Sequence, residues 1–249
     1  MDRTAYEQFY ELEKAHFWRI AKRRLVIEWI EVHAPQRSSL RFLDIGGACS
    51  VLPSELKRLG KVIVIEPDKQ TVAFAKETLQ IDIREGWLPD NLPVEGLFDV
   101  VTLLDCLEHL DEDEAALKAI WRLLQPGGVL ICTVPALKWL WSDHDVSLGH
   151  RRRYLRTELA KLLTNAGFTI RRLSYHTSML LPFLSVQRLM SRFIPNPDPQ
   201  EYRIRVPPAP INSLFGAVMS MERFLLRHIN LPVGSSLVAV CSKPTADVS

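Results

Sequence analysis

Residues 42–50 read FLDIGGACS, and this stretch decides the fold class of the chain. Apolar residues lead into an acid and two adjacent glycines, the pattern of a buried strand that ends in a tight turn. Residues 51–60, VLPSELKRLG, carry leucines at helical spacing before a glycine that ends the helix. Residues 61–67, KVIVIEP, form a second short apolar run. Together the segments predict a strand, a helix and a parallel second strand.

The same alternation of strands and helices continues toward the carboxyl end. Near-continuous apolar strands indicate a parallel sheet that is covered by helices on both faces, a doubly wound α/β fold. The expected segments are a helix at 69–79, strands at 81–85 and 98–104, a helix at 111–124, a strand at 129–135, a helix at 156–168, a strand at 169–175 and a last strand within 235–244.

Two segments interrupt this rhythm. Residues 136–154 are aromatic, histidine-rich and basic without a clean period, which predicts a long functional loop. Residues 177–235 hold two amphipathic helices, within 183–193 and 213–228. The proline-rich stretch between them, 194–212, is expected to lack regular structure.

The chain therefore reads as one domain of 249 residues, with subdivisions that the pattern suggests. The expected parts are N-terminal helices over 1–36, a cofactor-binding core over 37–176, a helical lid insertion over 177–235 and the final strand over 236–244.

The composition limits the classes of binding partner and the cellular location that we expect. A net charge of +2 is too small to indicate nucleic acid. The four cysteines stand singly in apolar stretches, which favours reduced thiols and a cytoplasmic location. No apolar run approaches the length of a membrane span, although MLLPFL at 179–184 beside Arg188 is compatible with shallow contact with a membrane surface. The oligomeric state is left open.

The order and spacing of four motifs resemble the class I, Rossmann-like S-adenosylmethionine-dependent methyltransferases, in particular the bacterial and ubiquinone-biosynthesis type that acts on small molecules. The motifs are LDIGGACS at 43–50, VIVIEPD at 62–68, LFDVVTLLDCLEHL at 97–110 and LLQPGGVLICTVP at 123–135. The likeness covers roughly residues 40–175, and HFWRIAKRR at 16–24 resembles an aromatic, basic segment common in that branch. It implies a seven-stranded sheet, mostly parallel, with an antiparallel last strand.

The resemblance also implies where S-adenosyl-L-methionine binds. A cofactor that crosses the strand ends needs close approach to the backbone, which Gly46 permits. Asp44, Gly47 and Ala48 belong to the same turn, where Asp44 either contacts the cofactor or bonds the amides of its own turn. Ala48 and Ser50 replace two glycines of the family loop, and Ser50 can offer a hydroxyl at the start of the following helix.

Further cofactor contacts are expected after the next strands. Glu66, followed by Pro67, is placed to accept hydrogen bonds from ribose hydroxyls, the alternative being a solvated turn acid. Trp87 and Leu88 stand where the family has a polar pair near the adenine; they either sandwich the base or, for the indole, join the core. The remaining expected cofactor contacts are Asp105 and Cys106, directly after the strand at 98–104.

Candidate catalytic residues follow from the chemistry of methyl transfer. The sulfonium is already activated, so a base is needed only where the acceptor must lose a proton. His109 and His150 are the candidate bases. Asp105, Glu108 and His109 resemble a signature that has been associated with a divalent metal in the ubiquinone-type branch; the alternative is a cluster at a helix start, and we predict no metal.

The predicted function is therefore methyl transfer from S-adenosyl-L-methionine to a small-molecule or lipid-like acceptor, with an oxygen acceptor favoured. The acceptor is expected to be apolar or anionic, since three consecutive arginines, 151–153, could bind an anion where they do not pair with surface acids. A relative that binds the cofactor without transferring methyl is the alternative, because the glycine loop is altered. A nicotinamide oxidoreductase is disfavoured because the G-x-G-x-x-G pattern is absent.

Overall fold

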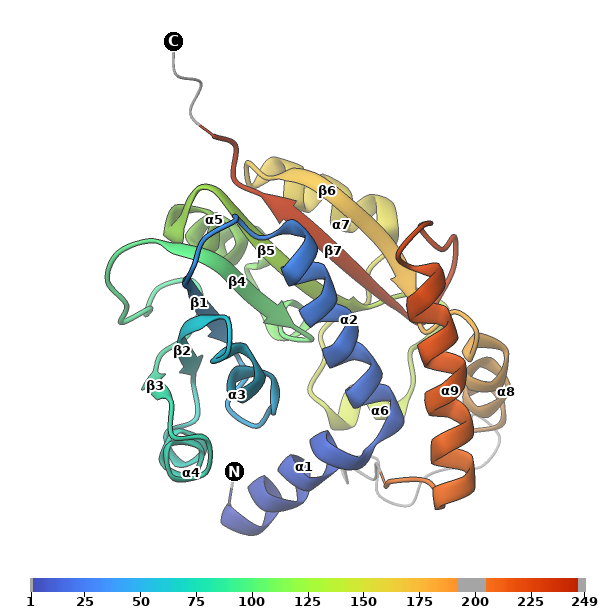
Figure 1. The fold of residues 1–249 in the computed structure, drawn as a ribbon. Coiled ribbons are helices and arrows are strands. Elements are labelled where there is room, and N and C mark those ends of the chain that lie inside the picture. Colours follow the sequence, from blue (N-terminus) through green and yellow to red (C-terminus); the bar gives the residue numbers. More distant parts are fainter. Residues whose placement is uncertain (1, 192–204, 246–249) are drawn as a thin grey trace.

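The computed structural model describes residues 2–191 and 205–245, and within them strands and helices alternate (Figure 1). The elements in chain order are α1 (Arg3–Ala15), α2 (Phe17–His33), β1 (Leu40–Ile45), α3 (Leu52–Leu56), β2 (Gly60–Glu66), α4 (Lys69–Leu79), β3 (Asp82–Glu85), β4 (Phe98–Leu104), η1 (Leu107–His109), α5 (Asp113–Leu123), β5 (Leu124–Pro135), η2 (Lys138–Leu140), α6 (Asp143–Ser147), α7 (Arg156–Asn165), β6 (Thr169–His176), α8 (Leu181–Ser191), α9 (Ala209–Leu225) and β7 (Ser236–Ser242).

The strands form one seven-stranded sheet in the order β3-β2-β1-β4-β5-β7-β6. The pairs from β3 to β5 are parallel, whereas β7 runs antiparallel to both β5 and β6. The strand order reverses between the neighbouring strands β1 and β4, so the chain continues from them toward opposite edges of the sheet. In such sheets, ligands bind at the carboxyl ends of the strands at this switch point. The fold class and the antiparallel last strand are as predicted.

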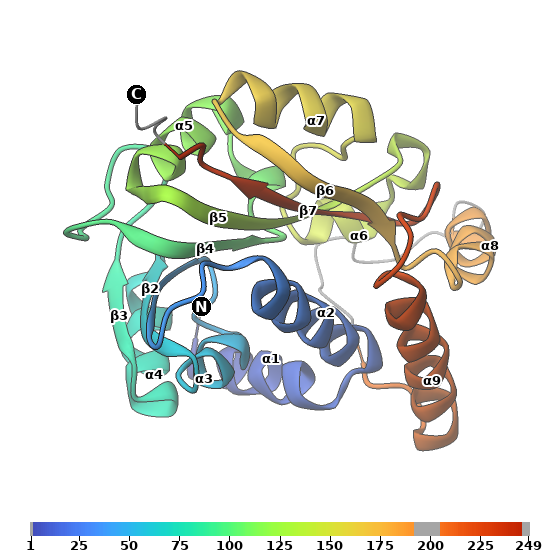
Figure 2. The same ribbon diagram turned by 45° about the horizontal axis from the view of Figure 1, so that its top comes forward.

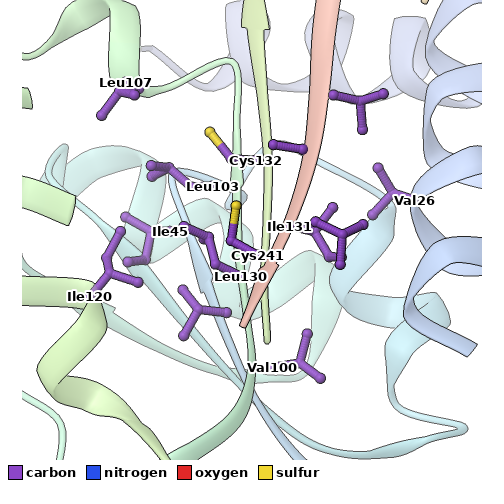
Figure 3. Packing of buried hydrophobic residues seen from close by; sticks show 14 of the residues in the cluster. Val26, Ile45, Val100, Leu103, Leu107, Ile120, Leu130, Ile131, Cys132 and Cys241 are labelled. Carbon is purple, nitrogen blue, oxygen red and sulfur yellow. The ribbon is translucent and has the colours of Figure 1, made fainter. Parts of the chain in front are cut away.

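Helices cover both faces of the sheet. Figure 2 shows α5 and α7 on one face and α2 on the other. Figure 3 shows Ile120 of α5 and Val26 of α2 approaching the central strands from opposite sides, with Ile131 and Leu103 between them. All four side chains are completely buried. This two-sided burial explains why the central strands are apolar without alternation.

The N-terminal segment forms two helices because His16 interrupts it. His16 has an extended backbone, and its Nδ1 accepts a hydrogen bond from the Trp18 N–H (3.2 Å), so it caps α2. α2 then packs beside α9, although the two helices lie far apart in the sequence (Figure 1). This packing places the basic first half of α2 over the carboxyl ends of the strands.

The structure corrects three local expectations. Gly60 begins β2 instead of ending α3. Glycine is needed at this position because an added Cβ would lie 1.9 Å from the Leu40 carbonyl oxygen. Residues 136–154 include two short helices, η2 and α6, where an irregular loop was expected.

The third correction concerns the proline-rich stretch 194–212. Residues 192–204 lie outside the described residues, but 209–212 already belong to α9. Pro210 is compatible with helix there because the first turn does not use its missing N–H.

Other expectations hold among the described residues. The four cysteines are free thiols. No helix within 2–191 and 205–245 is both long and apolar enough to cross a bilayer. The helical segments expected between the last two strands correspond to α8 and α9.

Candidate functional site

A cavity of about 640 Å³ opens at the carboxyl ends of the central strands. Its walls come from the turn after β1, the first half of α2, the segment after β4, the connection from β5 to α7, and helices α8 and α9. Six of the predicted site residues line it: Asp44, Gly46, Gly47, Asp105, His109 and His150.

The turn after β1 forms one end of the cavity. Gly46 has φ of 79°, and its N–H donates to the Ile65 carbonyl oxygen (2.8 Å). A Cβ at Gly46 would lie 3.1 Å from the Cys106 Sγ, and one at Gly47 would lie 1.7 Å from the Asp44 Oδ2. The turn therefore requires glycine for its backbone conformation at one position and for space at the other.

Within the described residues, Asp44 bonds neither the amides of its own turn nor a cation. Thr102 lies opposite it on β4 and donates its hydroxyl to the Asp44 Oδ1. The Oδ2 is buried and has no hydrogen-bond partner among the described residues. Burial raises the pKa of Asp44 to about 6, partly offset by the Thr102 hydroxyl. One buried oxygen of Asp44 is thus left to accept a hydrogen bond from a ligand in the cavity.

Several residues expected to contact the cofactor, Ala48 of the glycine turn and Glu66, Trp87 and Leu88 near the adenosine, lie outside the cavity lining. Ala48 is completely buried, and Leu88 belongs to the core. Trp87 is 48% exposed, so the indole is not a core residue. Glu66 ends β2 partly buried, and its Oε1 accepts from the Asp68 N–H (3.3 Å). Their contacts with a cofactor stay predictions.

Three neighbouring residues complete this part of the site. Burial raises the pKa of Glu66 to about 7. Pro67 is exposed at the end of β2. Cys106 contacts the Gly46 position with its sulfur, and burial holds the pKa of its thiol far above the usual value. Cys106 is therefore a neutral, space-filling side chain beneath the turn.

Ser50 does contribute a hydroxyl at the start of a helix. Its Oγ accepts a hydrogen bond from the Leu52 N–H (3.1 Å) where α3 begins, and it donates to the Glu13 Oε2 (3.2 Å). The serine therefore satisfies one backbone N–H at the start of α3, although it stands one position before the N-cap, Val51.

Basic residues of α2 line the cavity beside the glycine turn, and sequence reasoning assigned them no role. Arg19, Lys22 and Arg23 share one face of α2, and all three are buried. Arg19 and Arg23 both bond Glu13, and the Arg23 Nε also donates to the Glu55 Oε1 (2.9 Å). The sequence signal that could have identified this basic face is the spacing of three and four positions between basic residues in HFWRIAKRR.

Asp105 points toward α2 instead of joining the acids and histidines after β4. It forms an ion pair with Lys22 and accepts from the Thr133 hydroxyl (2.8 Å). Burial would raise the pKa of Asp105, but the Lys22 ammonium and these hydrogen bonds lower it to about 2. Asp105 is thus an anion whose charge is matched by Lys22.

The two candidate bases meet at the other end of the cavity. The rings of His109 and His150 lie edge to face with centroids 4.9 Å apart. The His150 Nε2 is 3.7 Å from the Glu108 Oε1. Glu108 is fully buried with both carboxylate oxygens unpartnered among the described residues, and burial holds its pKa well above the usual range. The structure therefore replaces the expected trio of Asp105, Glu108 and His109 with a trio that includes His150.

Donor atoms of Glu108, His109 and His150 all lie within 4.8 Å of one another. Two imidazoles and a carboxylate are a donor set that a divalent transition metal accepts. Binding would require Glu108 to give up the proton that burial favours. The absence of a metal stays a prediction, which elemental analysis of the purified protein checks.

The three consecutive arginines each pair with an aspartate. Arg151 pairs with Asp111, and Arg152 pairs with Asp113 (3.0 Å). Arg153 bonds Asp145 and is the member of this run that lines the cavity.

Helices α8 and α9 close the cavity with apolar side chains. Phe215 of α9 packs against Phe17 of α2 and Phe183 of α8, each at 5.2 Å between ring centroids. Arg188 of α8 faces the same space and donates to the Ser142 Oγ (2.6 Å). This wall offers aromatic surface with the Arg188 guanidinium beside it.

Comparison with known proteins identifies methyltransferases as relatives of this chain. Residues 17–173 match the family model described as a methyltransferase domain. A probable S-adenosylmethionine-dependent methyltransferase of Mycolicibacterium smegmatis is 31% identical over 113 residues, which is 44% of each chain. A ubiquinone biosynthesis O-methyltransferase of Nitrosococcus oceani is 35% identical over 42% of this chain and 47% of its own. The matches to these two relatives thus span less than half of their lengths.

A longer sequence match and two solved structures extend the comparison, and the solved structures agree with this chain in fold. A ubiquinone biosynthesis O-methyltransferase of Xanthomonas euvesicatoria is 30% identical over 173 residues, 61% of this chain and 71% of its own. An S-adenosylmethionine-dependent methyltransferase of Thermotoga maritima has a TM-score of 0.60 at 18% identity, covering 96% and 95% of the two chains. The [4+2]-cyclase SpnF has a TM-score of 0.60 at 20% identity, covering 92% and 83%.

Proposed function

This chain belongs to the class I S-adenosylmethionine-dependent methyltransferase family, and from that premise we propose that it methylates an oxygen of a small, lipid-like acceptor. The observation that carries the proposal is the single cavity that joins a glycine turn to a pair of histidines. Such a cavity can hold a methyl donor and an acceptor side by side, and alignment of the two supplies much of the catalysis.

The glycine-turn end fits S-adenosyl-L-methionine. Gly46 and Gly47 leave the backbone open to close approach, and the Asp44 Oδ2 is a buried acceptor without a partner among the described residues. Arg19 and Arg23 place buried positive charge beside this turn, suited to the carboxylate of the cofactor. When bound, the cofactor supplies a methyl group already activated by its sulfonium.

The other end fits an apolar acceptor. Phe17, Phe183 and Phe215 offer ring faces and edges on which an apolar or aromatic body would pack. Arg188 adds a cation for an anionic or polar substituent. The ubiquinone biosynthesis O-methyltransferases among the relatives support an oxygen acceptor with a lipid-like body.

A hydroxyl acceptor needs a base, and the two histidines supply it. Burial lowers the pKa of His109 below its usual value, so its ring is neutral and able to accept a proton at neutral pH. His150 stands edge to face with it and lines the same cavity. Either ring can receive the acceptor proton as the methyl group transfers; we assign the role to His150 because its side chain is held more firmly, as described below.

Contact with a membrane surface remains part of this proposal. α8 and α9 carry large apolar side chains that are more than half exposed, a distribution compatible with shallow burial in a lipid interface. These residues are Phe183, Val186, Leu189, Met190, Leu214, Met221 and Phe224. A lipid-like acceptor would reach the cavity directly from such a surface.

A methyl-release assay tests the proposal. The purified protein is incubated with S-adenosyl-L-methionine and fractionated cell extract, and the modified product is identified by mass spectrometry. We expect a product heavier by one methyl group on an oxygen, and none with Gly46→Val. Calorimetric binding of the cofactor without methyl release from any fraction would favour the alternative of a non-methylating relative, and absence of cofactor binding would overturn both.

A further inference from the structure

His150 is held from one side by Asp145, a residue that the predicted site did not include. Asp145 lies in the short helix α6, and its side chain is completely buried. Its Oδ1 is 2.9 Å from the His150 Nδ1, and its backbone carbonyl accepts from the His150 N–H at the same distance. Two contacts, one through the backbone and one through the side chain, therefore join the same pair of residues.

The other partners of Asp145 are all donors. The Arg153 Nε donates to its Oδ1 (2.8 Å) and the Arg153 Nη2 to its Oδ2 (3.1 Å). The Ser142 N–H also donates to the Oδ2 (3.0 Å). Burial would raise the pKa of Asp145, but the bond to His150 and the Arg153 charge lower it to about 2. Asp145 is an ionised carboxylate, which can only accept hydrogen bonds.

This donor pattern assigns the proton on the imidazole. Because the Asp145 carboxylate only accepts, the His150 Nδ1 must carry the hydrogen that lies between them. A neutral ring has one N–H, so the Nε2 of His150 is left with a lone pair. That Nε2 faces Glu108 and the His109 ring, inside the wall of the cavity.

Arg153 in turn fixes Asp145. Its guanidinium spans both carboxylate oxygens, and its Nη1 donates to the Ala136 carbonyl oxygen (2.9 Å) directly after β5. A bidentate contact of this kind fixes the plane of the carboxylate as well as its position. The orientation of His150 is thereby tied to the end of a central strand of the sheet.

We propose that Asp145 is the positioning residue of this site: it orients the His150 ring and holds it in the Nδ1–H tautomer, which leaves the Nε2 lone pair on the side of the ring that faces Glu108. The inference deepens the proposed function, on which the role of His150 as a base rests. It adds a residue that would act only through His150 and would touch neither cofactor nor acceptor.

The tautomer is measurable without an acceptor. Long-range ¹H–¹⁵N spectra of the full-length labelled protein are recorded at alkaline pH, and His150→Gln identifies the His150 signals. We expect the Nδ1–H form to dominate by about tenfold or more, the effect of one charge-assisted hydrogen bond. In Asp145→Asn we expect the two tautomers to approach equal populations.

Asp143→Asn is the matched control, because it removes the same charge from an exposed position of the same helix. It should leave the His150 spectrum unchanged. A dominant Nε2–H form in the wild type, or an unchanged Nδ1–H preference in Asp145→Asn, would overturn the proposal. The wild-type spectrum decides even if Asp145→Asn does not fold. Failure of the proposed function would appear separately, as absent cofactor binding or methyl release.

Discussion

The two ends of the cavity are built in different ways. At the glycine turn, the backbone determines the shape. Gly46 has a positive φ, Gly47 stands where no side chain fits, and the strand ends are held in register. At the histidine end, the shape comes from side chains on separate segments: Glu108 after β4, and Asp145 and His150 after β5. Backbone turns suit a constant cofactor, and side-chain clusters suit an acceptor that differs between enzymes.

The contrast extends to charge. Around the glycine turn, Lys22 is matched by Asp105 and Arg19 by Glu13, so the charges are largely balanced within the protein. At the histidine end, both carboxylate oxygens of Glu108 lack a hydrogen-bond partner within the described residues, whereas at the glycine turn one oxygen of Asp44 lacks a partner and the other accepts from Thr102. Buried groups without partners are costly, and they persist where a ligand or a reaction uses them. We therefore expect variants at the two ends to affect different measurements: cofactor affinity at one and turnover at the other.

The largest effect is expected for Gly46→Val. The valine would have to adopt a φ of 79° and place its Cβ 3.1 Å from the Cys106 Sγ, so cofactor affinity should fall by more than about 100-fold. Calorimetric titration with S-adenosyl-L-methionine and S-adenosylhomocysteine measures it. Gly127→Val is the control, with φ of 78° but an ordinary contact at 3.4 Å. Equal losses of affinity in both variants would show that general destabilisation, not the turn, is responsible.

The next effect is expected at the other end of the cavity. His150→Gln removes the base while keeping a polar side chain, so kcat for an oxygen acceptor should fall by about 10²- to 10⁴-fold. Cofactor affinity should stay within about threefold of wild type, since a factor of three is under 1 kcal/mol. His228→Gln, at an exposed position after α9, serves as control. A loss of cofactor affinity equal to the loss of kcat would remove the distinction between the two ends.

A smaller effect, with a pH dependence, is expected for Glu66→Gln. If the Glu66 carboxylate accepts hydrogen bonds from ribose hydroxyls, the variant should weaken cofactor binding by about 1.5–3 kcal/mol. The pKa of Glu66 is raised to about 7, so it binds a proton below that pH in the free protein. Wild-type affinity should therefore rise as pH increases through about 7.

Calorimetry across that range measures both effects of Glu66. The dependence on pH through 7 should disappear in Glu66→Gln. Asp68→Asn, which alters the neighbouring acid that caps α4, is the comparison: the Asp68 charge helps to raise the pKa of Glu66, so this variant should keep the pH dependence and move its midpoint to lower pH. Stability has the opposite sign: folding raises the pKa of this acid, so its contribution to stability falls as pH rises from about 4.5 toward 7. A pH-independent wild-type affinity would argue against the ribose contact.

The smallest effect is expected for Ala48→Gly. Ala48 is completely buried and does not line the cavity, so its methyl group takes no space from the cavity. Affinity should change by less than about tenfold, or 1.4 kcal/mol. Titration of the variant beside the wild type provides the measurement. Binding by the variant and none by the wild type would mean that the altered loop is inactive, and the functional proposal would fail with it.

Much of the fold could be predicted because its signals are local. The expected strand at 98–104 and helix at 69–79 agree with β4 and α4 residue for residue. The role of individual glycines and prolines was harder to predict. Gly60 allows the backbones of β1 and β2 to approach closely, and the sequence does not distinguish this role from that of a glycine at a helix end. Pro210 likewise marks the start of α9 instead of the continuation of a linker.

The site was predicted less completely, for a related reason. His109 and His150 were identified one at a time, from residue type and position after a strand. Their meeting with Glu108, and the support of His150 by Asp145, depend on how the connection after β5 folds back onto the segment after β4. Likewise, the basic residues of α2 gained a place in the cavity only when α2 packed beside α9.

By itself, the sequence determined the alternation of strands and helices, the glycine turn and the family to which they point, because periodicity and turn conformation depend on residues a few positions apart. Tertiary structure alone decided which charges are paired. Asp105 and Lys22 come from segments far apart in the chain and neutralise each other, whereas Glu108 meets His150 and keeps its oxygens without hydrogen bonds among the described residues. Burial and pairing set the protonation of such groups, and both exist only once the chain has folded.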